Sequence, residues 1–145
     1  MTFEAIGGHL YLVDTSAFSR ASSMPVAEIL TALIADRLAA TCITVDLEAG
    51  YSGRSADDVR AIMHTRGSLY VNLPVTEQIA ERARQTQLRM AARGQHRAAG
   101  IVDLLTAAIA EHHGAVVLHY DADFEHIAAV TGQPQLWIAP RGSLD

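Results

Sequence analysis

The chain has 145 residues, of which half are apolar and 19% are charged, and this composition excludes a disordered or fibrous protein. Its formal net charge of −5 argues against bulk attraction to nucleic acid. All eleven basic residues are arginines, which disfavours a Walker P-loop, a receiver domain and a haloacid-dehalogenase-type phosphatase, because each of these places a lysine beside a phosphate.

The amino-terminal stretch MTFEAIGGHLYLVD lacks a basic segment and runs directly into Asp14, so we expect no signal peptide. No run approaches the roughly 18 apolar residues that a membrane span requires. The single cysteine, Cys42, cannot form an intramolecular disulfide, which favours a reducing compartment. We therefore expect one soluble, cytoplasmic domain that covers residues 1–145.

Apolar patterning predicts an alternation of strands and helices. The predicted elements, in chain order, are a strand at 9–13, a short helix from about 15, a helix at 25–40, a strand at 41–43, a helix through Glu48 to about 50–53, helices at 55–65 and 76–93, a helix from 103 to 113, a strand at 115–119, a helix at 122–130 and a strand at 135–138. Ser55 with Asp58 forms a plausible capping pair, and Gly94 is expected to end its helix. This order predicts a mostly parallel sheet that is covered by helices on both faces.

Four acidic residues fall where such a fold would bring them to one edge of the sheet. Asp14 and Asp121 each follow a strand-like run, Glu48 lies in a short helix, and Asp103 opens a later helix. Ligands of open parallel sheets bind at the carboxyl ends of the strands. Four carboxylates could not all stay ionised there without a hard divalent cation, so the pattern predicts an Mg²⁺ or Mn²⁺ site and metal-dependent phosphate chemistry.

Structural roles are the alternative for some of these acids. Asp14 could be only an N-cap, and Asp121 and Asp123 could be first-turn acids favoured by a helix dipole. Glu48 and Asp103 have apolar neighbours, among which an unpaired carboxylate would be costly, so they favour a functional site. The seven histidines have no regular zinc-ligand spacing, which disfavours a zinc site.

Three arginines, Arg82, Arg89 and Arg93, share one face of the helix predicted at 76–93. Because a guanidinium pairs bidentately with phosphate oxygens, this stripe could bind an RNA backbone. The alternative is an ordinary solvated helix face.

Four motifs give the chain a family resemblance: LVDTSAF, TVDLEAGYSGRS, GIVDLLTAAIAEHHGAVVLHYDADFEHIA and TGQPQLWIAPRGS. In this order, and over nearly the whole chain, they resemble PIN-domain ribonucleases of the VapC toxin type. The resemblance implies a PIN-like three-layer α/β/α fold with a mostly parallel central sheet of four to five strands. It also implies catalytic acids at Asp14, Glu48, Asp103 and Asp121.

The same resemblance implies that these four acids bind Mg²⁺ or Mn²⁺, with Asp123 as an auxiliary acid. We expect Asp14, Asp103 and Asp121 to hold the ion and Glu48 to act on the attacking water, directly or through the metal. Ser16 would brace the site by hydrogen bonding. Many members carry Ser or Thr two residues before the fourth acid, where this chain has His119, and that departure leaves the role of His119 open.

As activity, the resemblance implies metal-dependent cleavage of a loop in a structured RNA, such as tRNA or rRNA, which would inhibit translation and growth. It also implies a cognate VapB-type antitoxin, seated in a groove of the early helices between residues 25 and 65, and a homodimer. Two alternatives stay open: a non-catalytic PIN-fold module that binds RNA, and a structure-specific DNA nuclease of the FEN type, which the absence of an arch-forming segment disfavours.

Overall fold

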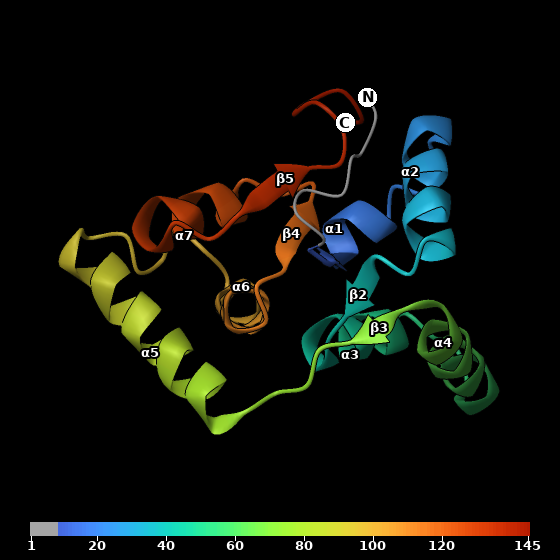
Figure 1. Ribbon diagram of the computed structural model, residues 1–145, viewed down its shortest axis with the longest axis horizontal. Coiled ribbons are helices and arrows are strands. Elements are labelled where there is room, and N and C mark those ends of the chain that lie inside the picture. Colours follow the sequence, from blue (N-terminus) through green and yellow to red (C-terminus); the bar gives the residue numbers. More distant parts are fainter. Residues whose placement is uncertain (1–8) are drawn as a thin grey trace.

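The computed structural model describes residues 9–145, which form an all-parallel sheet of five strands in the order β3-β2-β1-β4-β5 (Figure 1). The strands are β1 (Tyr11–Val13), β2 (Ala39–Thr41), β3 (Val71–Asn72), β4 (Val116–His119) and β5 (Gln135–Trp137). The helices are α1 (Thr15–Phe18), α2 (Met24–Ala35), α3 (Ile43–Tyr51), α4 (Ala56–Leu69), α5 (Glu77–Ala92), α6 (Ile101–His112) and α7 (Asp123–Thr131).

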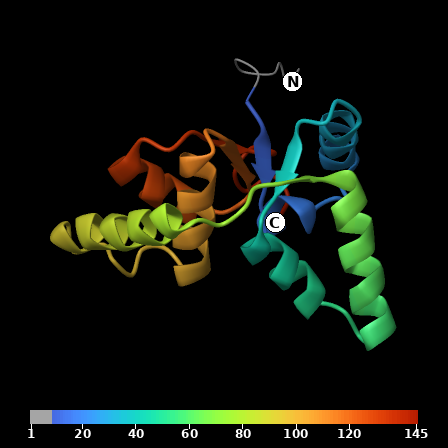
Figure 2. The ribbon, with the colours of Figure 1, turned by 60° about the horizontal axis from the view of Figure 1, so that its bottom comes forward.

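Successive side chains of β1 and β4 point to opposite faces of the sheet, and both faces are buried. Leu12 and Val117 belong to one core cluster, which they share with residues of α3, α5, α6 and α7. Val13 and Leu118, each the next residue in its strand, belong to a second cluster with residues of α1 and α2. Figures 1 and 2 show α5, α6 and α7 gathered on one side of the molecule and α2 and α4 on the other. The predicted α/β class with a parallel sheet and helices on both faces is confirmed.

The helix predicted at 25–40 ends earlier than its apolar pattern indicates. The backbone turns at Arg37, which has a left-handed φ of 58°, and the Leu38 N–H donates to the Leu33 carbonyl at 2.9 Å. This bond is typical of a helix C-terminal turn. Leu38 therefore lies outside α2, and β2 starts at Ala39 rather than at 41.

The two-residue strand β3 is absent from the sequence prediction because two residues carry no periodicity. It is defined by pairing alone, since Ala40 lies opposite Val71. Helix α4 also runs four residues beyond its predicted end at 65. The capping prediction is confirmed, because the Ser55 hydroxyl accepts the Asp58 N–H at 3.1 Å. Gly94 follows α5 with a φ of 68°, as expected of a residue that ends a helix.

The topology places a ligand-binding edge beside Asp14. Strand β1 is central, and the chain order reverses around it because β2 pairs on one side and β4 on the other. Ligands of open α/β sheets bind at such a reversal, outside the carboxyl ends of the strands. Asp14 directly follows β1, and Asp121 follows β4 by two residues. Within the described residues, none of the helices combines the length and apolarity that a membrane crossing needs.

Candidate metal centre

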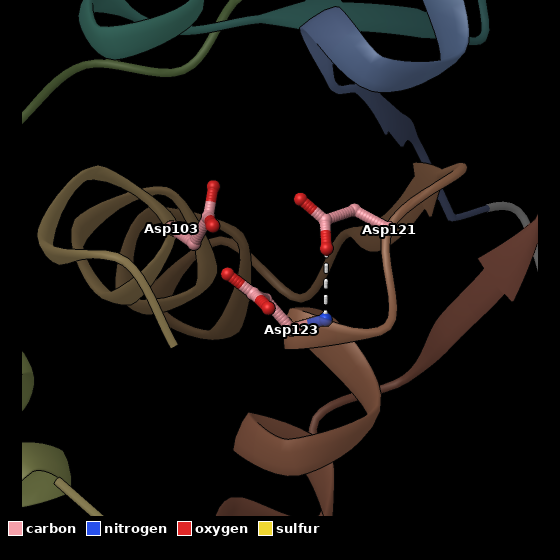
Figure 3. Close-up of side chains that lie close together, drawn as sticks. All are labelled: Asp103, Asp121 and Asp123. Carbon is pink, nitrogen blue, oxygen red and sulfur yellow. Dashed lines mark hydrogen bonds between the residues drawn. The ribbon is translucent and has the colours of Figure 1, made fainter. Parts of the chain in front are cut away.

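Three acidic side chains converge at this edge of the sheet. Asp103, Asp121 and Asp123 each offer a carboxylate oxygen, and these oxygens all lie within 4.8 Å of one another. Figure 3 shows the three side chains pointing toward one another, Asp103 from α6 and the other two from the start of α7 and the turn before it. The resemblance implies only an auxiliary role for Asp123, yet its carboxylate is one of the three that lie close together.

Backbone groups fix the orientation of these carboxylates. The Asp123 N–H donates to Asp121 Oδ1 at 3.0 Å, and the Gly100 N–H donates to Asp123 Oδ2 at 3.1 Å. Gly100 is also close to the third acid, since a Cβ there would lie 3.2 Å from Asp103 Oδ2. A glycine before α6 therefore leaves the space that the Asp103 carboxylate occupies.

Asp14 lies beside this group of three and is only 4% exposed. Its Oδ2 accepts the Ser16 N–H at 3.0 Å and the Ser16 hydroxyl at 2.6 Å, so Asp14 is an N-cap as well as a site candidate. The Ser16 Oγ in turn accepts the Tyr120 N–H at 2.9 Å. This hydroxyl therefore ties the end of β1 to the end of β4, and the function of Ser16 and Asp14 at a metal site stays a prediction.

Glu48 is an exposed residue of α3 whose carboxylate reaches toward α1. Its Oε1 accepts the Thr15 hydroxyl at 3.1 Å. Partial burial and the negative charge of Asp14 raise the pKa of Glu48, and the Thr15 hydrogen bond opposes them. The carboxylate is thus held near Asp14 without being part of the group of three.

The acidic side chains of this region disfavour one another's ionised forms, and a bound cation would relieve that repulsion. Burial raises the pKa of Asp103 to about 8, and the bond to Asp123 and the charges of Asp14 and Asp121 add to that rise. Within residues 9–145, no arginine or histidine forms an ion pair with any of the five acids. Hard divalent ions take oxygen ligands and favour ionised carboxylates, so the donor set and its charge fit Mg²⁺ or Mn²⁺.

His119 occupies the position where the resemblance implies a hydroxyl. The ring is fully buried at the end of β4, and its Nδ1 accepts the Asp121 N–H at 3.0 Å. The ring proton therefore lies on Nε2, which donates to Gln135 Oε1 at 2.5 Å. Burial lowers the pKa of His119, which favours this neutral form. Gln135 and His119 together orient the backbone that carries Asp121.

Replacing His119 with phenylalanine should weaken Mn²⁺ binding about 10- to 100-fold, because the ring volume is kept while the Asp121 N–H loses its acceptor. His119→Asn should retain most of the affinity, since the asparagine oxygen can accept that N–H. Calorimetric Mn²⁺ titration of both variants, below their melting temperatures, measures the effect. Equal affinities of His119→Phe and wild type would show that His119 only fills space.

The predicted arginine stripe packs against neighbouring helices. Arg82 pairs with Glu111 of α6 at 2.6 Å, Arg93 donates to the Ala129 carbonyl at 3.3 Å, and Arg89 donates to the Val130 carbonyl. These contacts hold α5 against α6 and α7. Such partners favour a structural role but leave the guanidinium groups partly exposed, so RNA binding by Arg82, Arg89 and Arg93 stays a prediction.

If the stripe binds RNA, the double replacement of Arg89 and Arg93 with alanine should flatten the salt dependence of binding by up to about one unit of log–log slope per lost phosphate contact. Affinity for a fluorescein-labelled single-stranded RNA between roughly 50 and 200 mM salt measures it. Arg84→Ala is the control, since Arg84 is an exposed arginine of the same helix whose ion pair, among the described residues, is with Glu81. An unchanged slope in the double variant would leave the stripe with its structural role alone.

A buried ion pair that the sequence did not reveal supports the helix of Glu48. Arg66 of α4 is 4% exposed, and its Nε lies 2.9 Å from Asp46 of α3. Its guanidinium also donates to Thr41 at 2.9 Å and lies over the Tyr70 ring. No local pattern in the sequence links Asp46 to Arg66, because the two residues lie 20 positions apart.

Comparison with known proteins agrees with this geometry. The PIN domain family matches residues 11–130. Ribonuclease VapC21 of Mycobacterium tuberculosis is 44% identical over 135 residues, which cover 92% of this chain and 96% of the relative. Ribonuclease VapC51 of the same species is 46% identical over 136 residues, which cover 93% and 97%.

Solved structures show the same fold. The structure of VapBC2 from Rickettsia felis bound to a promoter DNA fragment superposes with a TM-score of 0.72 at 14% identity, covering 88% of this chain and 98% of that one. VapBC-5 from Mycobacterium tuberculosis gives a TM-score of 0.58 at 25% identity, covering 88% and 96%.

Proposed function

This chain belongs to the PIN-domain family, and we propose that it is a metal-dependent endoribonuclease, the toxin of a VapBC-type type II toxin–antitoxin pair. The observation that carries the proposal is the acidic group of Asp103, Asp121 and Asp123, found at the carboxyl edge of the sheet in a chain with VapC ribonucleases as relatives. Asp14 is close enough to that group for its charge to act on Asp103, and Glu48 is close enough to Asp14 for the charge of Asp14 to act on it; these two residues complete the proposed set of acids.

Asp14, Asp103, Asp121 and Asp123 would hold Mg²⁺ or Mn²⁺. When bound, the ion supplies positive charge against the scissile phosphate and makes a nearby water more acidic. The backbone bonds to Asp121 and Asp123 preset the carboxylate positions, so little reorganisation is needed. The pKa of Asp103 is about 8 in the metal-free chain. A bound cation would favour the ionised carboxylate, so Asp103 would release its proton when the metal binds.

Glu48 would act on the attacking water. Its raised pKa makes it a better proton acceptor than an ordinary glutamate, and its exposed position lets water reach it. The Thr15 hydroxyl donates to one carboxylate oxygen, and within residues 9–145 the other oxygen accepts no hydrogen bond. Glu48 is therefore assigned to orient or deprotonate the water. The resemblance to VapC ribonucleases implies that the 3′ oxygen is the leaving group, so that the P–O3′ bond breaks and cleavage leaves a 5′-phosphate and a 3′-hydroxyl.

We infer that the substrate is a single-stranded loop of a structured RNA, such as tRNA or rRNA. Protein recognition of RNA sequence favours loops, where bases can be splayed out and reached. Cleavage there would inhibit translation and growth. A toxin that cuts cellular RNA acts where that RNA is, so we propose a cytoplasmic location.

The proposed partner is a VapB-type antitoxin. An apolar depression of about 270 Å³ lies between α3 and α4, within the early helices that the resemblance implies, and it is lined by Phe18, Ala49, Ile62, Leu69 and Tyr70, among others. Apolar grooves of this kind suit an amphipathic segment of a partner protein. Several solved structures with the same fold are of VapBC proteins, which supports an antitoxin partner. We also propose that the chain forms a homodimer.

Cleavage of total RNA by the purified chain tests the function. We expect cleavage in Mg²⁺ or Mn²⁺ that EDTA abolishes, and mapping of the new 5′ ends would give the cut site. A non-catalytic PIN module would instead bind RNA and leave it intact under every metal condition. That result would overturn the proposal.

A further inference from the structure

A depression borders the acidic site on the side of α3. Its volume is about 410 Å³, within the range of roughly 300–1,000 Å³ that is typical of small-molecule pockets. It is lined by Thr15, Thr44, Leu47, Glu48, Tyr51 and Val102. The four residues from α3 recur at intervals of three and four and therefore form a single face of that helix.

The depression is continuous with the proposed active site. Glu48 is itself one of its walls, and Thr15, which holds the Glu48 carboxylate at 3.1 Å, is another. Thr15 directly follows Asp14, and Val102 directly precedes Asp103. A chain whose phosphate lies at the acids would consequently place a neighbouring group in this depression.

Exposed apolar side chains dominate its rim. The side chain of Tyr51 is 93% exposed, which makes it the most exposed aromatic residue of those described in the structure. Leu47 is 59% exposed and Val102 42% exposed. Single-stranded RNA is bound largely by stacking of its bases on such aromatic rings.

We propose that this depression binds a nucleobase next to the scissile phosphate, with the Tyr51 ring stacked on the base and Leu47 and Val102 against its edges. The inference rests on the proposed function and adds a base-binding subsite to it. Stacking on an aromatic ring tolerates any base, so Tyr51 would position the strand more than select its sequence.

An RNA base fits the location better than a protein partner does. The depression between α3 and α4 is lined by Ala49, which lies on a different face of α3 from Leu47 and Tyr51, and by Ser52, which follows that helix. That second depression does not include any of the proposed catalytic acids among its lining residues. Of these two depressions, it is the one at Tyr51 that reaches Glu48, the residue assigned to the attacking water.

The test compares Tyr51→Ala, Tyr51→Phe and wild type on a single-stranded RNA octamer that carries the cut site mapped in total RNA. Tyr51→Ala should lower kcat/KM about 10- to 100-fold, and Tyr51→Phe should stay near wild type because stacking is retained. Met24→Ala is the control, since Met24 is 70% exposed at the start of α2. Melting temperatures of all variants verify that they fold equally.

Octamers with an abasic ribose on either side of the cut provide the second arm. On one of the two abasic octamers, the kcat/KM of wild type should be about 10- to 100-fold lower than on the intact octamer. The kcat/KM of Tyr51→Ala should differ little between these two octamers, because the variant already lacks the contact that the abasic site removes. Independent losses on both abasic octamers, or a Tyr51→Ala variant that cleaves like wild type, would overturn the inference and leave the ribonuclease function standing. The assay contains no antitoxin, so a depression that served only the antitoxin would also give the wild-type rate. Failure of wild type to cleave any RNA in Mg²⁺ or Mn²⁺ would instead remove the proposed function, and this inference with it.

Discussion

Replacing Asp103 with asparagine should lower RNA cleavage by at least about 10²- to 10³-fold, the effect expected when a preorganised electrostatic group is lost from an active site. Asp103 lies in the group of three carboxylates, and burial together with its acidic neighbours raises its pKa to about 8. Asp14→Asn should have a comparable effect. Asp36→Asn, which changes an exposed acid at the end of α2, is the control and should cleave normally.

Comparison with Glu48→Gln separates metal holding from action on water. This variant should lose turnover to a similar extent but keep most of its Mn²⁺ affinity, since Glu48 lies outside the group of three. Initial cleavage rates on the mapped RNA and calorimetric Mn²⁺ titrations measure the two properties. Near-wild-type cleavage by Asp103→Asn would remove it from the site, and loss of Mn²⁺ binding in Glu48→Gln would make Glu48 a metal ligand.

The second large effect concerns the stability of the metal-free protein. The folded-state pKa of Asp103 is about 8, far above the usual value of 3.8 for an aspartate. A raised pKa means that the folded chain holds a proton that the unfolded chain has already released. The stabilisation from this protonation is complete below about pH 4 and is lost as the pH rises toward 8. The melting temperature in EDTA should therefore fall from pH 5 to pH 8.

Asp103→Asn removes the titrating group at nearly constant shape. At pH 8 in EDTA, the variant should melt higher than wild type by roughly 3–8 °C, which corresponds to about 1–2 kcal/mol after allowance for the partial exposure of the carboxyl. At pH 5 the difference should shrink, because wild-type Asp103 is then protonated too. Excess Mg²⁺ should raise the wild-type melting temperature through ligand linkage and raise that of the variant much less.

Thermal scans of both proteins at two pH values, with EDTA or with Mg²⁺, test separately the effect of removing the charge and the effect of metal binding. A variant that melts below wild type in EDTA would show that Asp103 stabilises the fold as a first-turn acid of α6. An equal gain from Mg²⁺ in both proteins would show that the ion binds elsewhere. Either result would contradict the proposed acidic site.

Local patterns in the sequence were enough to predict most elements and the class of fold. The alternating apolar residues of β1 and β4 bury opposite faces, and the positions of Asp14 and Asp121 after these strands follow directly from where the apolar runs end. In a parallel sheet all strand ends of one kind lie at one edge, so the gathering of acids could be predicted without coordinates. The motifs then indicated the family.

Contacts between distant residues were decided only by the tertiary structure. Two-residue β3 exists because Ala40 lies beside Val71, and α2 ends where the backbone turns left-handed at Arg37, neither of which a periodic pattern contains. The group of three includes Asp123 because the turn after β4 aims it at α6.

The same holds for the groups that support and extend the site. The bond from His119 to Gln135 joins β4 to β5, and the depression beside Tyr51 needs α1, α3 and α6 together. Sequence periodicity reports which face of an element is buried, whereas these features depend on how separate elements pack against one another.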